Sequence, residues 1–409
     1  MDVKEEIIIV GAGIAGLATS LGLHRMGLSS IVLEASDKLR SSGFAFLTWT
    51  NAWKALDALG IGDTLRHQHI QLQGLVVAST ATGLETGKMS FIARGKHGDH
   101  EVRCVERHLL METLERELPR GTIRLNSKVV SIEEEVSGGR MKVLHLADGT
   151  TLKAKVLIGC DGVNSVVAKW LGLKRSSSSG RSGVRGIAEY LEGHGFKPEF
   201  LQYFGARFKS GFLPCDDKKM YWFFTWNPSP QEKEMEQDPI KMKQFVLSNL
   251  GKVPQQVSEV VERSDLSNLL SSHIRFRSPF NILFGNISKA NVCVAGDALH
   301  PMTPDLGQGA CSALEDGVIL ARCLGEALST EGGGGGGEQE RIEKGLKRFA
   351  EERRWRAFGL VGTAYVLGLL QQSDGPVVNF LTDKCLSGFM AGLFLNKADF
   401  DCGRLGVGL

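Results

Sequence analysis

Residues 7–16 read Ile-Ile-Ile-Val-Gly-Ala-Gly-Ile-Ala-Gly, a β-branched run that leads directly into a glycine-rich turn. Such a run is typical of a strand that is buried on both faces of a parallel sheet. Apolar residues at helical spacing over 14–26 then predict a helix, and residues 31–33 predict a second strand. The sequence therefore begins with a strand–turn–helix–strand unit, the first element of an α/β fold.

The turn has glycines at positions 11, 13 and 16, with Ala15 inside the motif and Glu34 at the end of the second strand. Gly11 permits the tight turn, Gly13 lets a pyrophosphate approach the backbone, and Gly16 lets the helix pack closely on the strand. The N-terminus of the helix adds N–H donors and a positive dipole. A carboxylate at position 34 accepts hydrogen bonds from ribose hydroxyls and disfavours a 2′-phosphate, and with it a tightly bound NADP. The unit predicts a dinucleotide site but does not distinguish FAD from NAD.

Two later motifs also follow predicted strands. Residues 158–167 read Ile-Gly-Cys-Asp-Gly-Val-Asn-Ser-Val-Val. Residues 292–309 read Val-Cys-Val-Ala-Gly-Asp-Ala-Leu-His-Pro-Met-Thr-Pro-Asp-Leu-Gly-Gln-Gly. With the first turn, and in this order, they resemble the group A FAD-dependent monooxygenases, the aromatic-hydroxylase family that includes salicylate hydroxylase, para-hydroxybenzoate hydroxylase and, more distantly, zeaxanthin epoxidase. The resemblance spans nearly the whole chain and is strongest to the salicylate-hydroxylase-like monooxygenases of plants.

This resemblance implies a tightly but non-covalently bound FAD, with NADPH or NADH as a transient co-substrate. It implies that Glu34 holds the adenosine ribose, that Asp161 serves structure and the approach of the nicotinamide, and that Asp297 bonds a ribityl hydroxyl. Arg107 matches the family's arginine at a helix start, and Arg40 is a weaker match. The candidate cofactor-binding residues are Gly11, Gly13, Ala15, Gly16, Glu34, Arg40, Arg107, Val129, Asp161, Gly162, Gly296, Asp297, Gly307 and Gly309.

The resemblance further implies a monooxygenase that uses NAD(P)H and O2 to hydroxylate or epoxidise a small aromatic or electron-rich substrate through a flavin C4a-hydroperoxide. No side chain is obligatory for this chemistry, so His300, beside Pro301, is a weak candidate for a general base and a stronger one for a structural residue. Gly307 and Gly309 precede a predicted helix whose positive end would stabilise reduced flavin by ~0.3–2 kcal/mol. Two alternatives stay open: an FAD-dependent reductase or dehydrogenase without oxygen insertion, and a flavin-binding regulatory protein with little turnover.

The predicted fold is α/β: a Rossmann-type FAD-binding domain like that of para-hydroxybenzoate hydroxylase, an interleaved β-sheet substrate domain and C-terminal helices. The FAD-binding domain is expected to be discontinuous, over residues 1–75, 101–175 and 286–330. The substrate domain is expected over residues 76–100 and 176–285. Within it, Ser176–Gly180 predicts a mobile loop, and the aromatic run 221–226 predicts a sheet face whose alternate side chains either pack or line the pocket.

The C-terminal region, residues 331–409, is expected to be helical, with a flexible glycine-rich loop at 332–337. Residues 353–356 read Arg-Arg-Trp-Arg and predict a solvated helix face. Glu315 and Asp316 are expected to face a neighbouring loop, and no metal-ligand spacing occurs.

The composition excludes several classes of protein. With 48 basic and 46 acidic residues, nucleic acid is not an expected partner. Eight scattered cysteines and an apolar strand that starts close to Met1 predict a reduced, cytoplasmic compartment without a signal or transit peptide. The uncharged stretch from Ala357 to Leu370 is shorter than the about 20 residues of a spanning helix, which leaves peripheral membrane contact open. The expected partners are a small-molecule substrate, O2 and NAD(P)H, in a monomer or homodimer.

Overall fold

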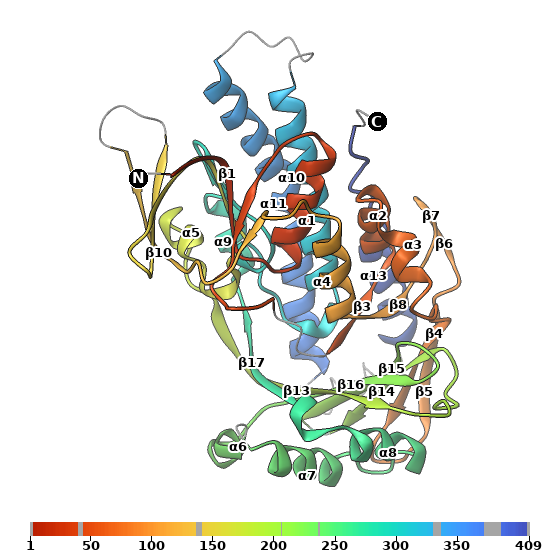
Figure 1. Cartoon of the computed structure of the whole chain (residues 1–409). Coiled ribbons are helices and arrows are strands. Elements are labelled where there is room, and N and C mark those ends of the chain that lie inside the picture. Colours follow the sequence, from red (N-terminus) through yellow and green to blue (C-terminus); the bar gives the residue numbers. More distant parts are fainter. Residues whose placement is uncertain are drawn as a thin grey trace.

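Figure 1 shows the computed structural model, which describes residues 3–39, 44–135, 141–205, 207–235, 238–329, 337–371 and 386–406. The first of its two large sheets is centred on β1 (Val3–Val10), which pairs in parallel with β2 (Ile31–Leu33) and β12 (Thr151–Gly159). β9 (Ile123–Arg124) pairs in parallel with β2, and β19 (Val292–Val294) with the end of β12. β10 (Val129–Glu134) and β11 (Lys142–Leu146) add an antiparallel edge. The parallel strands end at one edge, where ligands bind in sheets of this kind.

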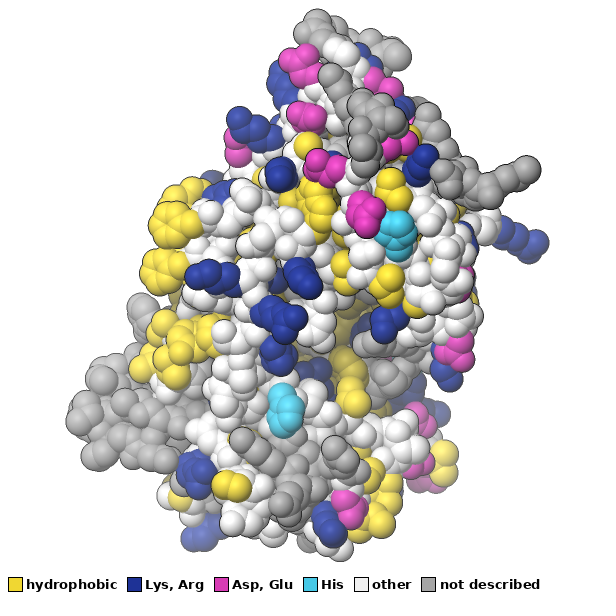
Figure 2. Space-filling view, turned by 90° about the vertical axis from the view of Figure 1, so that its left-hand side faces the viewer, with side chains coloured by type: hydrophobic (Ala, Val, Ile, Leu, Met, Phe, Trp, Pro, Cys, Tyr) yellow, Lys and Arg dark blue, Asp and Glu magenta, His cyan; other side chains and the backbone are white. Residues whose placement is uncertain are grey.

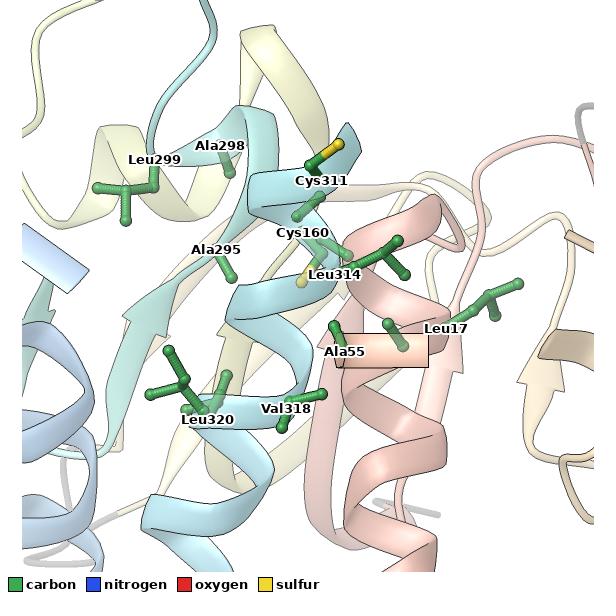
Figure 3. Packing of buried hydrophobic residues seen from close by; sticks show 14 of the residues in the cluster. Leu17, Ala55, Cys160, Ala295, Ala298, Leu299, Cys311, Leu314, Val318 and Leu320 are labelled. Carbon is green, nitrogen blue, oxygen red and sulfur yellow. The ribbon is translucent and has the colours of Figure 1, made fainter. Parts of the chain in front are cut away.

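Two helices, α1 (Ile14–Arg25) and α10 (Gly309–Leu328), pack against each other beside this sheet. They approach closely at Gly317, because a Cβ there would lie 2.7 Å from the Cβ of Ala18. Figure 3 shows Leu314 and Val318 of α10 pointing toward α1, in front of the strands. Ile8 in β1 is fully buried, as its β-branched run predicts.

The second sheet has the strand order β17-β13-β16-β15-β14-β4-β5. Its strands are β4 (Gly74–Ser79), β5 (Glu85–Ser90), β13 (Ser177–Glu189), β14 (Glu199–Gly205), β15 (Phe208–Pro214), β16 (Lys219–Trp226) and β17 (Leu270–Phe276). β4 pairs in parallel with β14, and the other neighbours are antiparallel. Strands from two distant parts of the chain thus share this sheet, and the predicted α/β fold with a second sheet and C-terminal helices is confirmed.

β16 shows how the second sheet separates two environments. Trp222 and Phe224 are buried in a core with side chains of α7 (Pro239–Asn249) and α8 (Gln255–Arg263), which lie below the sheet in Figure 1. The intervening Tyr221 and Phe223 line a cavity on the opposite face. Since successive side chains of a strand point to opposite faces, the aromatic run both packs and lines the cavity.

The prediction of a mobile loop at Ser176–Gly180 is wrong, because β13 begins at Ser177 and pairs with β17. The Ser179 hydroxyl donates to the Ile274 carbonyl at 2.9 Å, and Arg275 Nε donates to the Ser176 hydroxyl at 3.0 Å. Small polar residues favour a loop when taken alone. Here the neighbouring strand supplies partners for both backbone and side chains, which overrides the local preference.

The C-terminal helix α11 (Glu338–Gln371) packs against α10 and α9 (Pro279–Phe284), and α13 (Leu386–Ala398) contacts β5. Residues 332–336 of the predicted glycine-rich loop lie outside the described residues. Within the described ranges, no helix combines the length and the hydropathy that crossing a bilayer requires. The other elements are α2 (Thr50–Ala58), α3 (Gly62–Arg66), α4 (Arg107–Arg116), α5 (Val166–Trp170), α6 (Pro230–Met235), β3 (Ala45–Thr48), β6 (Arg94–Gly95), β7 (Gly98–Asp99), β8 (Arg103–Glu106), β18 (Ser288–Lys289) and four short 3₁₀ turns among the described residues.

The prediction of a solvated face at residues 353–356 holds for the exposed Trp355 but is wrong for Arg353. Arg353 is fully buried, and its guanidinium donates to Glu315 Oε2 and Asp316 Oδ1, both at 2.5 Å. Arg356 Nη2 donates to Glu315 Oε1 at 2.7 Å. Glu315 therefore faces α11 and not a loop, whereas Asp316 faces α11 and also, as predicted, the loop that follows β19. Burial requires each carboxylate to have a cationic partner.

Asp316 joins this network to the loop that follows β19. Its Oδ2 accepts hydrogen bonds from the Gly296 backbone N–H and from His300 Nε2, both at 2.7 Å. Burial opposes ionisation of Asp316, but its interactions with His300, Arg353 and the Gly296 N–H outweigh this effect and lower the pKa to about 2. The start of α10, which borders the cavity, is thereby fixed to α11 and to the first sheet.

We expect Arg353→Ala to lower the free energy of unfolding by about 3–5 kcal/mol, because it leaves two buried carboxylates short of a cation. Lys347→Ala, an exposed change on the same helix, should stay within about 0.5 kcal/mol. Urea unfolding followed by circular dichroism measures both. Because the pKa of Asp316 is depressed, its contribution is present above about pH 4 and is lost as the pH falls toward about 2, so the difference should shrink there. Equal unfolding midpoints for both variants would contradict the role given to Arg353.

Candidate functional site

A cavity of about 810 Å³ extends from the ends of the parallel strands to the inner face of the second sheet. Its first part is lined by the glycine turn after β1 and by residues that follow β2 and β12. Its far part is lined by apolar and aromatic side chains of the second sheet. The predicted site residues that line it are Gly11, Gly13, Ala15, Glu34, Arg107, Val129, Asp161, Gly162, Asp297, Gly307 and Gly309.

The three glycines of the turn have different reasons to be glycine. Gly11 has a φ of +102°, and a Cβ there would overlap the carbonyl of Cys160. A Cβ at Gly16 would overlap the carbonyl of Gly11, so the packing of α1 on β1 depends on it. At Gly13, by contrast, a Cβ would meet nothing within 4 Å, and no side chain caps the first turn of α1. The backbone at Gly13 is therefore open to the cavity, with helix N–H donors available for a phosphate.

Glu34 is oriented by the backbone around it. Its Oε2 accepts a hydrogen bond from the Ala12 N–H at 2.9 Å, and its Oε1 accepts one from the Ser36 N–H at 3.0 Å. A carboxylate has about four acceptor positions, so both oxygens can still accept bonds from a ligand. The geometry suits a vicinal diol at this end of the cavity.

The two carboxylate oxygens of Asp161 have different surroundings. Its Oδ2 accepts from the Val166 N–H at 2.7 Å and so caps α5, whereas its buried Oδ1 has no hydrogen-bond partner among the described residues. Burial raises the pKa of this carboxyl group. A buried acceptor without a donor costs about 1–3 kcal/mol, so Oδ1 fits a donor from a molecule in the cavity.

Asp297 lines the cavity and is exposed to it, and desolvation by the surrounding protein raises the pKa of its carboxyl group. Two cations that also line the cavity, Arg107 and Arg185, lie near the ring of Phe44. Their guanidinium carbons lie 5.8 and 5.0 Å from the ring centroid. Arg185 was not among the predicted site residues, because β13 also carries Arg181 and Glu189 and nothing in the sequence alone singles out Arg185.

The glycines before α10 bring its first turn against the cavity. Gly307 has a φ of +63°, and a Cβ there would lie 3.0 Å from Trp49 Nε1. That indole N–H is buried and without a hydrogen-bond partner among the described residues. Together with the open backbone at Gly13 and the unpaired Asp161 oxygen, this polar lining fits an extended dinucleotide.

A buried ionic triad that the sequence did not reveal joins the second sheet to the turn before α10 at the cavity. Asp305, just before Gly307, accepts from Arg181 Nη1 at 3.0 Å, from Arg181 Nη2 at 2.6 Å and from Lys209 Nζ at 2.8 Å. Burial opposes ionisation of Asp305, but Lys209 and Arg181 hold the pKa of its carboxyl group well below the usual range. Burial lowers the pKa of Lys209, which lines the cavity together with Asp305.

The remaining predicted residues do not line the cavity. Gly16 and Gly296 lie behind it, where a Cβ at Gly296 would come 2.6 Å from the Cβ of Ala15. His300 is fully buried, and its Nε2 contacts Asp316 and the Ser312 hydroxyl. Pro301, the next residue, does not line the cavity either. Arg40 lies outside the described residues. Among the described residues, no group of three or more His, Cys, Asp or Glu side chains could hold a metal ion.

Comparison with known proteins agrees with this geometry. Residues 4–357 match the family model described as "FAD binding domain". The chain is 49% identical over 406 residues to "Monooxygenase 2" of Arabidopsis thaliana, covering 98% of each, and 37% identical to "Monooxygenase 1" of the same plant, covering 98% and 99%. The structure of Klebsiella pneumoniae HpxO with FAD and uric acid has a TM-score of 0.82 at 20% identity, covering 99% of this chain and 98% of that one. The cofactor of this fold is therefore FAD.

The difference between Gly13 and Gly16 gives a sharp test of the cofactor site. Gly13→Ala should weaken FAD binding at least about tenfold, because its methyl group enters the cavity, while the apoprotein unfolds as the wild type does. Gly16→Ala should destabilise the apoprotein itself by about 1–3 kcal/mol through overpacking. FAD titration of the apoproteins and their thermal unfolding measure the two effects. Wild-type FAD affinity in Gly13→Ala would contradict a pyrophosphate at this turn.

Proposed function

The chain belongs to the FAD-binding-domain family and to its group A FAD-dependent monooxygenases, and from this premise we propose that it uses NAD(P)H and O2 to hydroxylate or epoxidise a small aromatic or electron-rich substrate. The observation that carries the proposal is the continuity of the cavity. One space joins the dinucleotide turn after β1 to an aromatic-lined chamber on the second sheet. A cofactor held by the turn and a substrate held by the sheet would therefore meet without a gap.

Several cavity residues would each bind a different part of FAD. Helix N–H groups near Gly13 would bind the pyrophosphate and Glu34 the adenosine ribose, while Asp297 would accept from a ribityl hydroxyl. Gly307 and Gly309 would leave the first turn of α10 open to the isoalloxazine ring, whose negative charge on reduction the helix dipole stabilises. When bound, FAD would supply the activation of O2 and the transfer of one oxygen atom to the substrate.

The chamber on the second sheet favours a flat substrate that carries an acidic group. Phe200, Tyr221 and Phe223 offer ring faces, and Gln202 and Thr225 add polar contacts. The triad has two cations and one carboxylate, so it leaves one net positive charge beside the chamber. Phenols and phenolic acids have this combination of a flat ring and an acidic group. Uric acid, which HpxO binds in its solved structure, is also flat and acidic.

The direct test is a visible spectrum of the purified protein, followed by NADPH and NADH oxidation and oxygen uptake against a panel of phenols. We expect flavin absorption, and nicotinamide oxidation that a subset of phenols accelerates with matched oxygen uptake and an oxygenated product. Nicotinamide oxidation that needs an electron acceptor other than O2 would favour a reductase instead. A flavin-loaded protein that no substrate stimulates would favour a regulatory protein.

Lys209 should contribute to selectivity within that panel. In Lys209→Met, Asp305 keeps its two hydrogen bonds from Arg181, but the chamber loses one positive charge. We expect KM for phenolic acids to rise about tenfold, as for the loss of a charged hydrogen bond, while neutral phenols change less and the FAD content stays the same. Lys252→Met, on the exposed surface, is the matched control. Equal changes in KM for acidic and neutral phenols would show that Lys209 does not recognise the acidic group of the substrate.

A further inference from the structure

The uncharged stretch from Ala357 to Leu370 forms the second half of α11 and has two apolar faces. Leu360, Val361, Ala364 and Leu367 are buried against the rest of the protein. On the other face, Val366 and Leu369 are 52% and 56% exposed. A helix that only packs on a core carries polar residues on its outer face, so packing against the described residues does not account for this second apolar face.

The outer face continues toward the N-terminus of α11 and onto α9. Trp355 is 65% exposed and lies on the same side of the helix as Val366 and Leu369, since 3.6 residues make one turn. On α9, Phe280 and Phe284 are 63% and 80% exposed. We call these five residues, Phe280, Phe284, Trp355, Val366 and Leu369, the apolar ridge.

The aromatic part of the ridge is ordered by ring contacts. Phe280 stacks on Phe284 with centroids 6.5 Å apart, and Phe358 makes edge contacts with Phe280 at 6.2 Å and with Trp355 at 5.7 Å. Arg354 Nη1 donates to the carbonyls of residues 282, 283 and 285, which holds the end of α9 on α11. The rings are therefore held outward on a fixed support rather than on a loop.

Basic residues border the ridge on the side of α9, whereas the exposed Glu351 and Glu352 lie one turn before Trp355 on α11. Residues 162–188 and 266–296, which include α9, contain no Asp or Glu, although the whole chain has a net charge of only +2. Lys174, Arg175, Arg275 and Lys289 lie exposed on these two segments. Arg277, directly before α9, donates to the Lys174 carbonyl, and a Cβ at Gly285 would meet the Leu173 side chain, so the basic loop abuts α9. Figure 2 shows hydrophobic side chains gathered at the left edge of this face with Lys and Arg beside them, while acidic side chains lie mainly toward the top and the right.

From this combination we propose that the apolar ridge and its basic border dock the protein on the surface of an anionic phospholipid membrane. Phe and Trp side chains suit the boundary between headgroups and acyl chains. Lys and Arg beside them suit anionic headgroups, to which each contributes favourably within a Debye length. A second copy of this chain would instead place two positively charged borders opposite each other, which disfavours self-association.

The test uses the FAD-loaded full chain and sedimentation with vesicles of phosphatidylcholine, with or without phosphatidylglycerol. We expect binding to the anionic vesicles, weaker binding at high salt, and little binding to phosphatidylcholine alone. Phe284→Ser combined with Trp355→Ser, and Lys174→Glu combined with Arg175→Glu, should each reduce the apparent affinity at least about tenfold.

Two control variants match these changes elsewhere on the surface. Leu191→Ser removes an apolar side chain that is 94% exposed in the second-sheet region, and Lys252→Glu reverses an exposed charge there. Both should bind vesicles as the wild type does. Flavin absorbance and thermal unfolding check that every variant is folded. Trp355→Phe should keep vesicle binding but lose part of the fluorescence quenching by brominated lipids, because it removes the inserted indole.

Three results would overturn the proposal. One is the absence of binding to anionic vesicles, and another is equal binding by the ridge variants and the controls. The third is a wild-type dimer in light scattering that the Phe284→Ser and Trp355→Ser combination converts to a monomer, which would make the ridge a contact between copies. Vesicle binding is measured without turnover, so its result does not depend on whether the proposed substrate is correct.

Discussion

Two adjacent carboxylates, Glu315 and Asp316, are shielded from water, and the wall of the cavity depends on the cations that neutralise them. An unpaired buried charge costs several kcal/mol, so α10 cannot take its place unless Arg353 of α11 docks at the same time. Through Asp316 the same network reaches Gly296 and His300, which precede the loop to Gly307. One polar cluster thus positions the start of α10, on which the cavity relies, although none of its members needs to touch a ligand.

The elements that the sequence predicted are those whose cause is local. The strand over Ile7–Val10, the turn from Gly11 to Gly16 and the helix after it follow from adjacent residues, because β-branched side chains, φ > 0 and helical spacing act within a few positions. Asp161 likewise lies just after the carboxyl end of β12, where it lines the cavity. The sequence could also indicate that cofactor residues gather, since the carboxyl ends of parallel strands share one edge.

What the sequence could not predict depends on partners that are far apart in the chain. Arg353 looks like a solvated residue within its own helix, and only the buried carboxylates of α10 explain its burial. Ser177 belongs to a strand because β17, almost a hundred residues later, lies beside it. The triad of Arg181, Lys209 and Asp305 joins three separate segments. In each case a polar residue that is unremarkable locally finds a charge or a backbone that only the fold brings near.

The two faces of α11 connect these observations. Its inner face fixes α10, and with it one wall of the cavity, through Arg353, and its outer face carries Trp355 two residues later. A rigid helix transmits position between its faces, because side chains two residues apart leave it in nearly opposite directions. A surface that binds the apolar ridge would therefore hold the cavity at a fixed height and orientation.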